Sequence, residues 1–218
     1  MMLNLDKTKT MIINYTDNYK FTTNLHLSDK NIEVVSKTKL LGVILTNDLK
    51  WSANTNYLIK KAYACMRMIH KLVEFDMPTS EMVLIYILYI RSIIEQSCQI
   101  WHSSLTQEDS DNLERVQKTA LKTILGNDYI SYEDALSETD LSTLSERRDA
   151  LCLKFAVKSH KCSKTSDMFP LNRVISNTRL PQEKFQVFRG NTSRFDKSAI
   201  PYMQKLLNEH FKEGAKKP

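Results

Sequence analysis

The sequence predicts an α+β protein that is mainly α: a small N-terminal antiparallel β meander, then a helical bundle, then a basic C-terminal arm. Two patterns predict this order. Residues 10–46 alternate between apolar and polar positions as strands do, and from Asn54 onward the apolar positions recur at the helical period. The chain of 218 residues also has only four glycines and five prolines, which is too few for a sandwich with many tight turns.

The N-terminal part is expected to form short strands. Its runs MIINY, FTTNLHL, IEVV and LLGVIL are rich in β-branched and aromatic residues, and the turn formers TDN and SDKN separate them. We assign residues 1–52 to this meander, with a hairpin at LLGVIL, as the first of three regions.

The second region, residues 53–162, is expected to be a helical bundle. Its first helix begins near Asn54, and the apolar face of that helix holds Leu58, Ala62, Cys65, Ile69 and Leu72. The opposite face carries a row of cations, Lys60, Arg67 and Lys71. A second helix, from about Ser80 to Trp101, is apolar nearly all round, which predicts a central place in the bundle.

The third helix is expected to begin after Thr106, which can cap it with Asp109 three residues on, and to stop at Gly126. Its apolar face holds Leu113, Val116, Ala120 and Ile124, and its outer face carries a second basic row, Arg115, Lys118 and Lys122. Ser131 with Asp134 predicts the start of a short helix, and a long helix follows over residues 143–161.

The third region, residues 163–218, is expected to be a basic, loop-rich arm with a final helix near residues 201–212. Residues 151–218 hold 14 Lys and Arg against 5 Asp and Glu, whereas residues 1–150 hold 17 against 20. A basic arm favours an acidic partner, most often nucleic acid. The alternative is a solvated tail that keeps the protein in solution.

Residues for metal or hydrolytic chemistry do not gather in the sequence. The chain has no adjacent pair of aspartates, and its five histidines show no metal-binding spacing. It also has no glycine-rich phosphate loop and no nucleophile elbow. We therefore expect no catalytic residues, no metal, no cofactor and no small-molecule substrate.

The sequence also gives an expectation for location. Its four cysteines are widely spaced, and the N-terminus is polar without an apolar leader, so we expect an intracellular protein, nuclear or cytoplasmic, that is not secreted. The apolar run Met82–Ile90 is too short to cross a bilayer, and we expect a buried helix there and no membrane partner.

Five stretches, in order, resemble the reverse transcriptases of non-LTR retrotransposons, especially jockey-like elements. The first covers LNLDKTKTMII, IEVVSKTKLLGVILTNDLKW and NYLIKKAYACMRMIHKL, and is similar to the region just downstream of the family's catalytic aspartates. The second resembles the thumb helix of the family and reads IYILYIRSIIEQSCQIWH. The others are LERVQKTALKTILG, LSTLSERRDALCLKFAVK and RGNTSRFDKSAIPYMQKLLN.

The resemblance implies a palm-to-thumb fragment that is inactive as a polymerase. In the family, the strand that matches Lys7 and Lys9 lies near the incoming nucleotide, and the hairpin around Gly42 lies where the primer is gripped. The family's catalytic aspartates would lie upstream of Met1, so Mg²⁺ is expected only in a full-length parent enzyme. We expect weak, non-specific binding of RNA, DNA or their hybrid through Lys7, Lys9, Gly42, Lys60, Arg67, Lys71, Arg147, Arg148, Arg189 and Arg194.

Two other interpretations stay open at this point. The helical bundle is also suited to a non-catalytic protein-interaction module. The stretch Leu3–Leu45 further resembles a short segment of the N-terminal part of an AlkB-type repair homologue. That enzyme class needs an H-x-D pair on iron, and no histidine in this chain is followed two residues later by aspartate.

Overall fold

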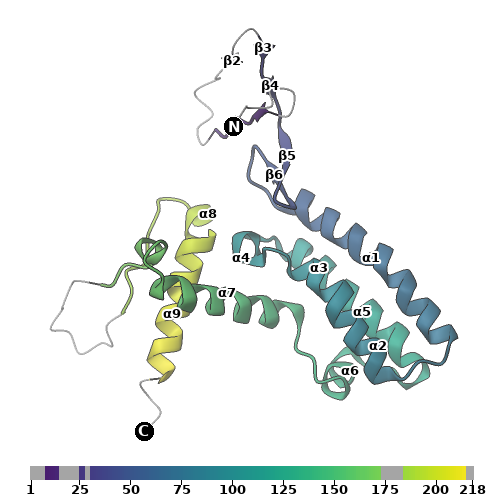
Figure 1. The fold of residues 1–218 in the computed structure, drawn as a ribbon. Coiled ribbons are helices and arrows are strands. Elements are labelled where there is room, and N and C mark those ends of the chain that lie inside the picture. The colour runs from purple at the N-terminus through teal and green to yellow at the C-terminus, as the bar shows by residue number, and fades with distance from the viewer. Residues whose placement is uncertain (1–7, 15–24, 28–29, 173–183, 215–218) are drawn as a thin grey trace. The chain divides into compact units, whose positions relative to one another are not determined.

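The structure is a computed structural model, and it describes residues 8–14, 25–27, 30–172 and 184–214 (Figure 1). It confirms the α+β, mainly α class, with short strands first and helices after them. The chain divides into two compact units, Met1–Leu58 and Ile59–Pro218. This division lies a few residues after the first boundary expected from the sequence, which follows residue 52.

The described strands of the first unit form three separate pairs instead of one continuous meander. β1 (Lys9–Thr10) pairs in parallel with β4 (Glu33–Val34). β2 (His26–Leu27) pairs in antiparallel fashion with β3 (Lys30–Asn31), and β5 (Lys37–Leu40) does so with β6 (Val43–Thr46). The parallel pairing of β1 with β4 is the feature that a simple meander would not produce.

The β5–β6 hairpin is closed by two residues with left-handed backbone. Leu41 has a φ of 48° and Gly42 a φ of 90°. Positive φ at both central residues is typical of two-residue hairpin turns, whose twist matches that of the strands. Below the turn, Val43 and Ile44 are buried, and the Ile44 amide donates a 3.0 Å hydrogen bond to Oδ1 of Asn54. This bond ties the hairpin to the start of α1 (Ser52–Glu74).

Helix α1 follows the expected pattern closely. Leu58, Ala62 and Ile69 are buried, whereas Cys65 and Leu72 are half-buried. The sequence pattern did not include Met66, which is also buried. The helix continues past the division after Leu58, so most of its length belongs to the second unit.

The apolar segment after α1 is a chain of short helices, where the sequence predicted one helix from Ser80 to Trp101. α2 (Thr79–Ile85), the π-helix η2 (Tyr86–Arg91) and α3 (Ser92–Glu95) follow one another directly. Ser97 then takes a left-handed φ of 53° before α4 (Cys98–Trp101) and η3 (His102–Ser104). The segment is not buried all round, because its outward positions Leu84, Leu88 and Tyr89 are exposed.

Helix α5 (Gln107–Leu125) begins and ends where the sequence indicates. The Thr106 hydroxyl accepts a hydrogen bond from the Asp109 amide. Gly126, which caps the C-terminus of α5 and begins η4 (Gly126–Asp128), has a φ of 55°. Ser131 caps α6 (Tyr132–Glu138) in the same way. α5 and α6 share a core of Leu121, Leu125, Tyr132 and Ala135.

The C-terminal region packs onto the bundle, and the compact unit Ile59–Pro218 includes both sides of the boundary expected between residues 162 and 163. α7 (Leu144–Lys161) starts with a capping box between Thr143 and Glu146. It is followed by η5 (Ser166–Met168), α8 (Ser193–Asp196) and α9 (Ala199–Gly214). α9 crosses α7 (Figure 1), and one core joins Cys152, Ala156, Phe169, Phe185, Met203 and Leu207.

Two buried amide side chains of α9 hold the extended chain before it. Asn208 accepts from the Phe185 amide at 2.8 Å and donates to the Phe185 carbonyl at 2.9 Å. Gln204 accepts from the Phe188 amide and donates to the Met168 carbonyl, both at 2.8 Å. Because these amides satisfy backbone groups that lack a strand partner, part of the expected loop-rich arm has a fixed path.

Candidate nucleic-acid interface

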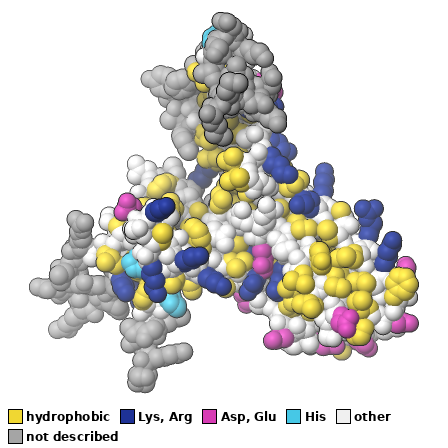
Figure 2. All heavy atoms as spheres, viewed as in Figure 1, with side chains coloured by type: hydrophobic (Ala, Val, Ile, Leu, Met, Phe, Trp, Pro, Cys, Tyr) yellow, Lys and Arg dark blue, Asp and Glu magenta, His cyan; other side chains and the backbone are white. Residues whose placement is uncertain are grey.

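The basic row of α1 is exposed, as the helical pattern predicts. Lys60, Arg67 and Lys71 all face solvent, on the side of the helix opposite its buried positions. Figure 2 shows Lys and Arg side chains along α1. Arg67 and Lys71 are one turn apart, and Lys60 lies two turns before Arg67, so the three cations can contact a phosphate backbone together.

Helix α5 exposes the second row. Arg115, Lys118 and Lys122 are exposed, while the four apolar positions expected on the other face are all buried. The ammonium group of Lys118 lies 4.8 Å from the centre of the Tyr132 ring. That cation–π contact restrains Lys118 without neutralising its charge.

The candidate residues of the first unit have local structural roles. Lys9 Nζ lies 3.1 Å from Oε2 of Glu33, its partner across the β1–β4 pair. Gly42 occupies the hairpin turn, where its positive φ would strain a residue with a Cβ atom. Lys7 lies outside the described residues.

Arg147 is held by a carboxylate of a neighbouring helix. Its Nε lies 3.1 Å from Oε1 of Glu95, and the Nε of Arg91 lies 3.5 Å from the same oxygen. Two guanidinium groups therefore share one carboxylate, and this cluster joins η2 and α3 to α7. The Arg147 side chain remains 40% exposed, but the geometry directs its guanidinium to Glu95.

The expectation that Arg148 contacts nucleic acid is wrong. Arg148 is fully buried; its Nε donates to Nδ1 of His102 at 3.1 Å and its Nη2 to Oγ of Ser110 at 3.3 Å. Burial lowers the pKa of Arg148, although nearby carboxylates partly offset that effect. A phosphate in solution cannot reach a guanidinium in this position.

The sequence does contain a signal for this burial. Leu144, Arg148, Cys152 and Ala156 are each four residues apart, and all four are buried on one face of α7. Helical phase therefore separates Arg148 from its neighbour Arg147, which lies about 100° further round the helix.

The half-buried residues His102, Asp149 and Tyr202 complete the polar cluster around Arg148. Nε2 of His102 lies 2.6 Å from Oδ1 of Asp149, and the hydroxyl of Tyr202 donates to the same oxygen. Burial opposes ionisation of Asp149, but the hydrogen bonds from His102 and Tyr202 prevail and lower the pKa of its carboxyl. Burial and the Asp149 carboxylate together raise the pKa of Tyr202.

The His102–Asp149 pair is not arranged as a catalytic dyad. Because the Arg148 Nε–H donates to Nδ1 of His102, that nitrogen must accept, and the ring proton must sit on Nε2 facing Asp149. Both ring nitrogens are therefore engaged within the protein, and neither can take a proton from a substrate. The cluster joins η3, α5, α7 and α9.

A second buried polar network, which the sequence did not indicate, surrounds Gln117 of α5. Gln117 accepts from the Tyr86 hydroxyl at 2.6 Å and donates to the Tyr132 hydroxyl at 2.9 Å and to the Ser142 carbonyl at 3.0 Å. The Tyr132 hydroxyl in turn donates to Glu114. Burial raises the pKa of Tyr86, and burial with the Glu114 bond raises that of Tyr132, so both phenols stay protonated.

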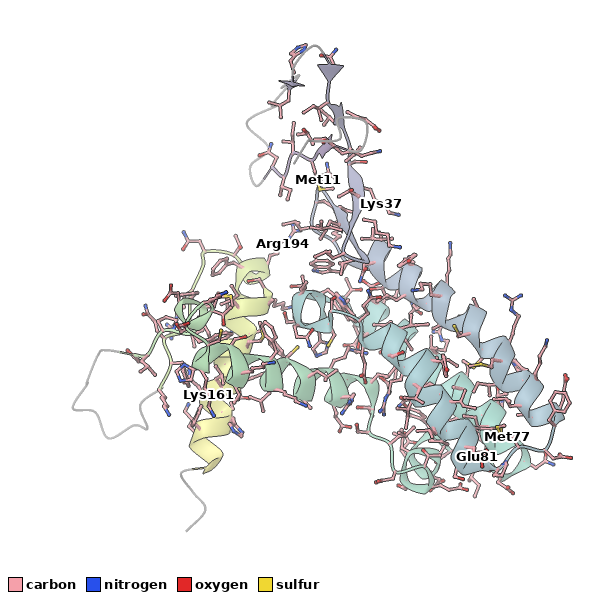
Figure 3. The ribbon with its side chains drawn as sticks, in the orientation of Figure 1. Met11, Lys37, Met77, Glu81, Lys161 and Arg194 are labelled. Atoms are coloured by element: carbon pink, nitrogen blue, oxygen red, sulfur yellow. The ribbon has the colours of Figure 1, made fainter. Side chains whose placement is uncertain are left out.

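The two candidates of the C-terminal region are both exposed. Arg189 follows the segment that Gln204 holds, and Arg194 lies in the short helix α8, as Figure 3 shows. α8 is capped by Thr192, and the Gly190 amide donates to Oδ1 of Asp196 at 3.3 Å. Arg189 and Arg194 therefore lie on an ordered part of the chain close to the start of α9.

No group of three or more His, Cys, Asp or Glu residues suited to a metal ion occurs in the part of the chain that the structure describes. By length and composition, the helical stretch Thr79–Ser104 could cross a membrane. A single helix of this kind is weak evidence; Tyr86, Ile90 and Ile94 of this stretch are buried, but only 28% of its most apolar window is.

Comparison of the chain with protein-family models, with curated proteins and with solved structures found no match.

Proposed function

We propose that this chain is the palm-to-thumb part of a reverse transcriptase of the non-LTR retrotransposon type, and that its helical unit binds nucleic acid without base preference. The partner is RNA, DNA or their hybrid, and the chain acts in the nucleus or cytoplasm. The observation that carries the proposal is the pair of exposed basic rows on α1 and α5, Lys60, Arg67, Lys71, Arg115, Lys118 and Lys122. The ordered series of family-like stretches supports the assignment to this enzyme class.

The rows favour phosphate contact over base readout. Their cations stand on the outer faces of two long helices at helical spacing, and long flexible Lys and Arg side chains grip a backbone by charge. Such contacts carry no sequence information directly, and they release counterions from the nucleic acid. Binding is therefore weak, general and strongly dependent on salt.

Fluorescence anisotropy with labelled duplex DNA, duplex RNA and hybrid tests the proposal. We expect similar affinities for unrelated sequences, and a log–log slope against salt of roughly −4 to −5, as expected if about four to six phosphates are neutralised. Absence of binding to all three ligands at low salt would contradict the proposal.

The chain alone is expected to be inactive in primer extension. Two-metal polymerisation needs carboxylates that hold two ions about 4 Å apart, and the sequence has no adjacent pair of aspartates. Incorporation of nucleotides above a buffer blank, on an RNA template with Mg²⁺ or Mn²⁺, would show that this expectation is wrong.

A protein-interaction role is the second candidate, and one observation favours it. Leu84, Leu88 and Tyr89 expose apolar surface on α2 and η2, and Figure 2 shows hydrophobic side chains gathered over this part of the chain. Exposed apolar patches of this kind mark interaction sites. A pull-down that recovers the same protein partner with and without nuclease would support this role, whereas a partner lost after nuclease treatment would support the first proposal.

A further inference from the structure

The end of α1 presents an aromatic ring beside two cations of the basic row. Phe75 follows directly after the helix and is 80% exposed. A shallow, open depression of about 450 Å³ lies beside it, lined by Arg67, Met68, Lys71, Leu72 and Phe75. The depression thus combines apolar and aromatic side chains with two positive charges.

The backbone fixes Phe75 in this position. The Asp76 amide donates to the Val73 carbonyl at 3.1 Å, and the Met77 amide donates to the Leu72 carbonyl at 3.2 Å. Asp76 has a left-handed φ of 50°. These features form a Schellman motif with Phe75 as the C-cap residue, so the ring projects from an ordered helix end. A backbone that is ordered before binding loses little conformational entropy when its side chain binds a ligand.

We propose that this depression binds an unpaired nucleobase, which stacks on Phe75 while Arg67 and Lys71 contact the adjoining phosphates. The inference rests on the proposed function and adds to it a site for single-stranded segments. Base stacking on an aromatic side chain next to a basic groove is how proteins bind single strands without sequence preference. Bases inside a duplex are already stacked, so only an unpaired base can lay its face on the ring.

The charge of the depression agrees with this ligand. Two of the five lining residues are cations and none is acidic. Glu74 and Asp76 flank Phe75 in the sequence, but neither lines the depression. A nucleotide carries an aromatic ring and an anion in one unit, and the depression offers a partner for each.

Two other ligands fit the depression less well. Attachment to an anionic membrane scales with the apolar area that is buried, and only Met68, Leu72 and Phe75 supply apolar side chains here. A docked amphipathic helix would need anchor sites over several of its own turns, whereas the lining residues span about two turns of α1.

The test uses the full chain with labelled oligo(dT) and with a long duplex that has few ends. Phe75→Ala is expected to weaken oligo(dT) binding about 5- to 150-fold, because one stacking contact is removed, and to leave duplex affinity and its salt slope unchanged. Phe75→Trp should keep the affinity for oligo(dT), and its added fluorescence should be quenched on binding. The matched control is Phe155→Ala, at a partly exposed phenylalanine of α7, which should change neither affinity.

The outcomes separate this inference from the proposed function. If the wild-type chain binds the duplex but Phe75→Ala leaves oligo(dT) affinity unchanged, or weakens both ligands equally, the stacking site is wrong and the proposed function stands. If Phe75→Ala abolishes binding to anionic phospholipid vesicles without changing oligo(dT) binding, the depression is a membrane contact. If the wild-type chain binds no nucleic acid at all, the proposed function fails and this inference fails with it.

Discussion

Basic residues play opposite roles on α1 and on α7. On α1, Lys60, Arg67 and Lys71 stand on an exposed face, one or two turns apart, and their charges face solvent. On α7, Arg148 is fully buried among His102 and Ser110, and its neighbour Arg147 is bound to Glu95. The difference teaches that the phase of a cation on its helix, more than the local density of charge, decides whether it can meet a phosphate.

The physical cost of each arrangement differs as well. An exposed cation stays hydrated and contributes little to folding, so a row of them can serve binding without affecting stability. A buried guanidinium has lost its water and must find hydrogen-bond partners inside the protein. We therefore expect α7 substitutions to change stability and α1 substitutions to change binding.

Loss of Arg148 should have the largest effect. Arg148→Ala removes the donor to Nδ1 of His102 and to Oγ of Ser110 and leaves a cavity, so we expect the free energy of unfolding to fall by about 3 kcal/mol. Urea unfolding followed by circular dichroism measures this free energy for the variant and for wild type.

The matched control for this prediction is Arg147→Ala. Its ion pair with Glu95 is partly exposed, so the loss should be about 0–1 kcal/mol. Equal losses for the two adjacent arginines would contradict the distinction between the buried and the ion-paired residue.

The Gln117 network should come next. Gln117→Leu roughly keeps the volume of the side chain but leaves the Tyr86 hydroxyl without its acceptor. We expect the free energy of unfolding to fall by about 2 kcal/mol. Gln107→Leu, at the exposed first turn of the same helix, should stay within about 0.5 kcal/mol of wild type. Thermal unfolding of both variants gives the comparison, and a neutral Gln117→Leu would show that the network adds no stability.

Acid should weaken the polar cluster around Arg148, by less than the Arg148 and Gln117 substitutions weaken the fold. Because folding lowers the pKa of Asp149, its contribution is present above the unfolded-state pKa of about 4 and disappears as pH falls through the lower folded-state value. The Asp149 side chain is 40% exposed, so we expect Asp149→Asn to cost only about 0.5–1 kcal/mol at neutral pH.

The difference between Asp149→Asn and wild type should shrink as the pH falls from about 4 toward 2, because the wild-type carboxyl is then protonated as well. Unfolding curves at several pH values would show it. A difference that grows in acid would contradict the assigned role of Asp149.

Much of the helical architecture could be predicted from the sequence, because its signals are local. Thr106, Gly126 and Ser131 mark helix ends through their own backbone and side-chain chemistry, and the apolar face of α5 follows from spacing alone. The interruption of the apolar segment at Ser97 and the π-helix at Tyr86–Arg91 could not be predicted, since both satisfy packing and hydrogen bonds made with other parts of the chain.

The candidate interface shows the same limit. The exposed rows of α1 and α5 followed from helical phase, but the partners of Arg147 and Arg148 are 38–52 residues away in sequence. The Gln117 network likewise depends on contacts 15–31 residues apart. Sequence spacing on one helix says which side a residue faces, and only the fold says what lies there.

The most direct test of the account is the salt dependence of duplex binding for two variants. Lys60→Gln/Arg67→Gln/Lys71→Gln should flatten the log–log slope by about 2 to 3, since each phosphate contact contributes about 0.9, while the free energy of unfolding stays near that of wild type. Arg147→Gln should change the slope by less than about 0.5, because its guanidinium is bound to Glu95. An unchanged slope in the triple variant, or a slope flattened by about 0.9 in Arg147→Gln, would contradict the claim that the exposed row of α1, and not the ion-paired Arg147, contacts phosphates.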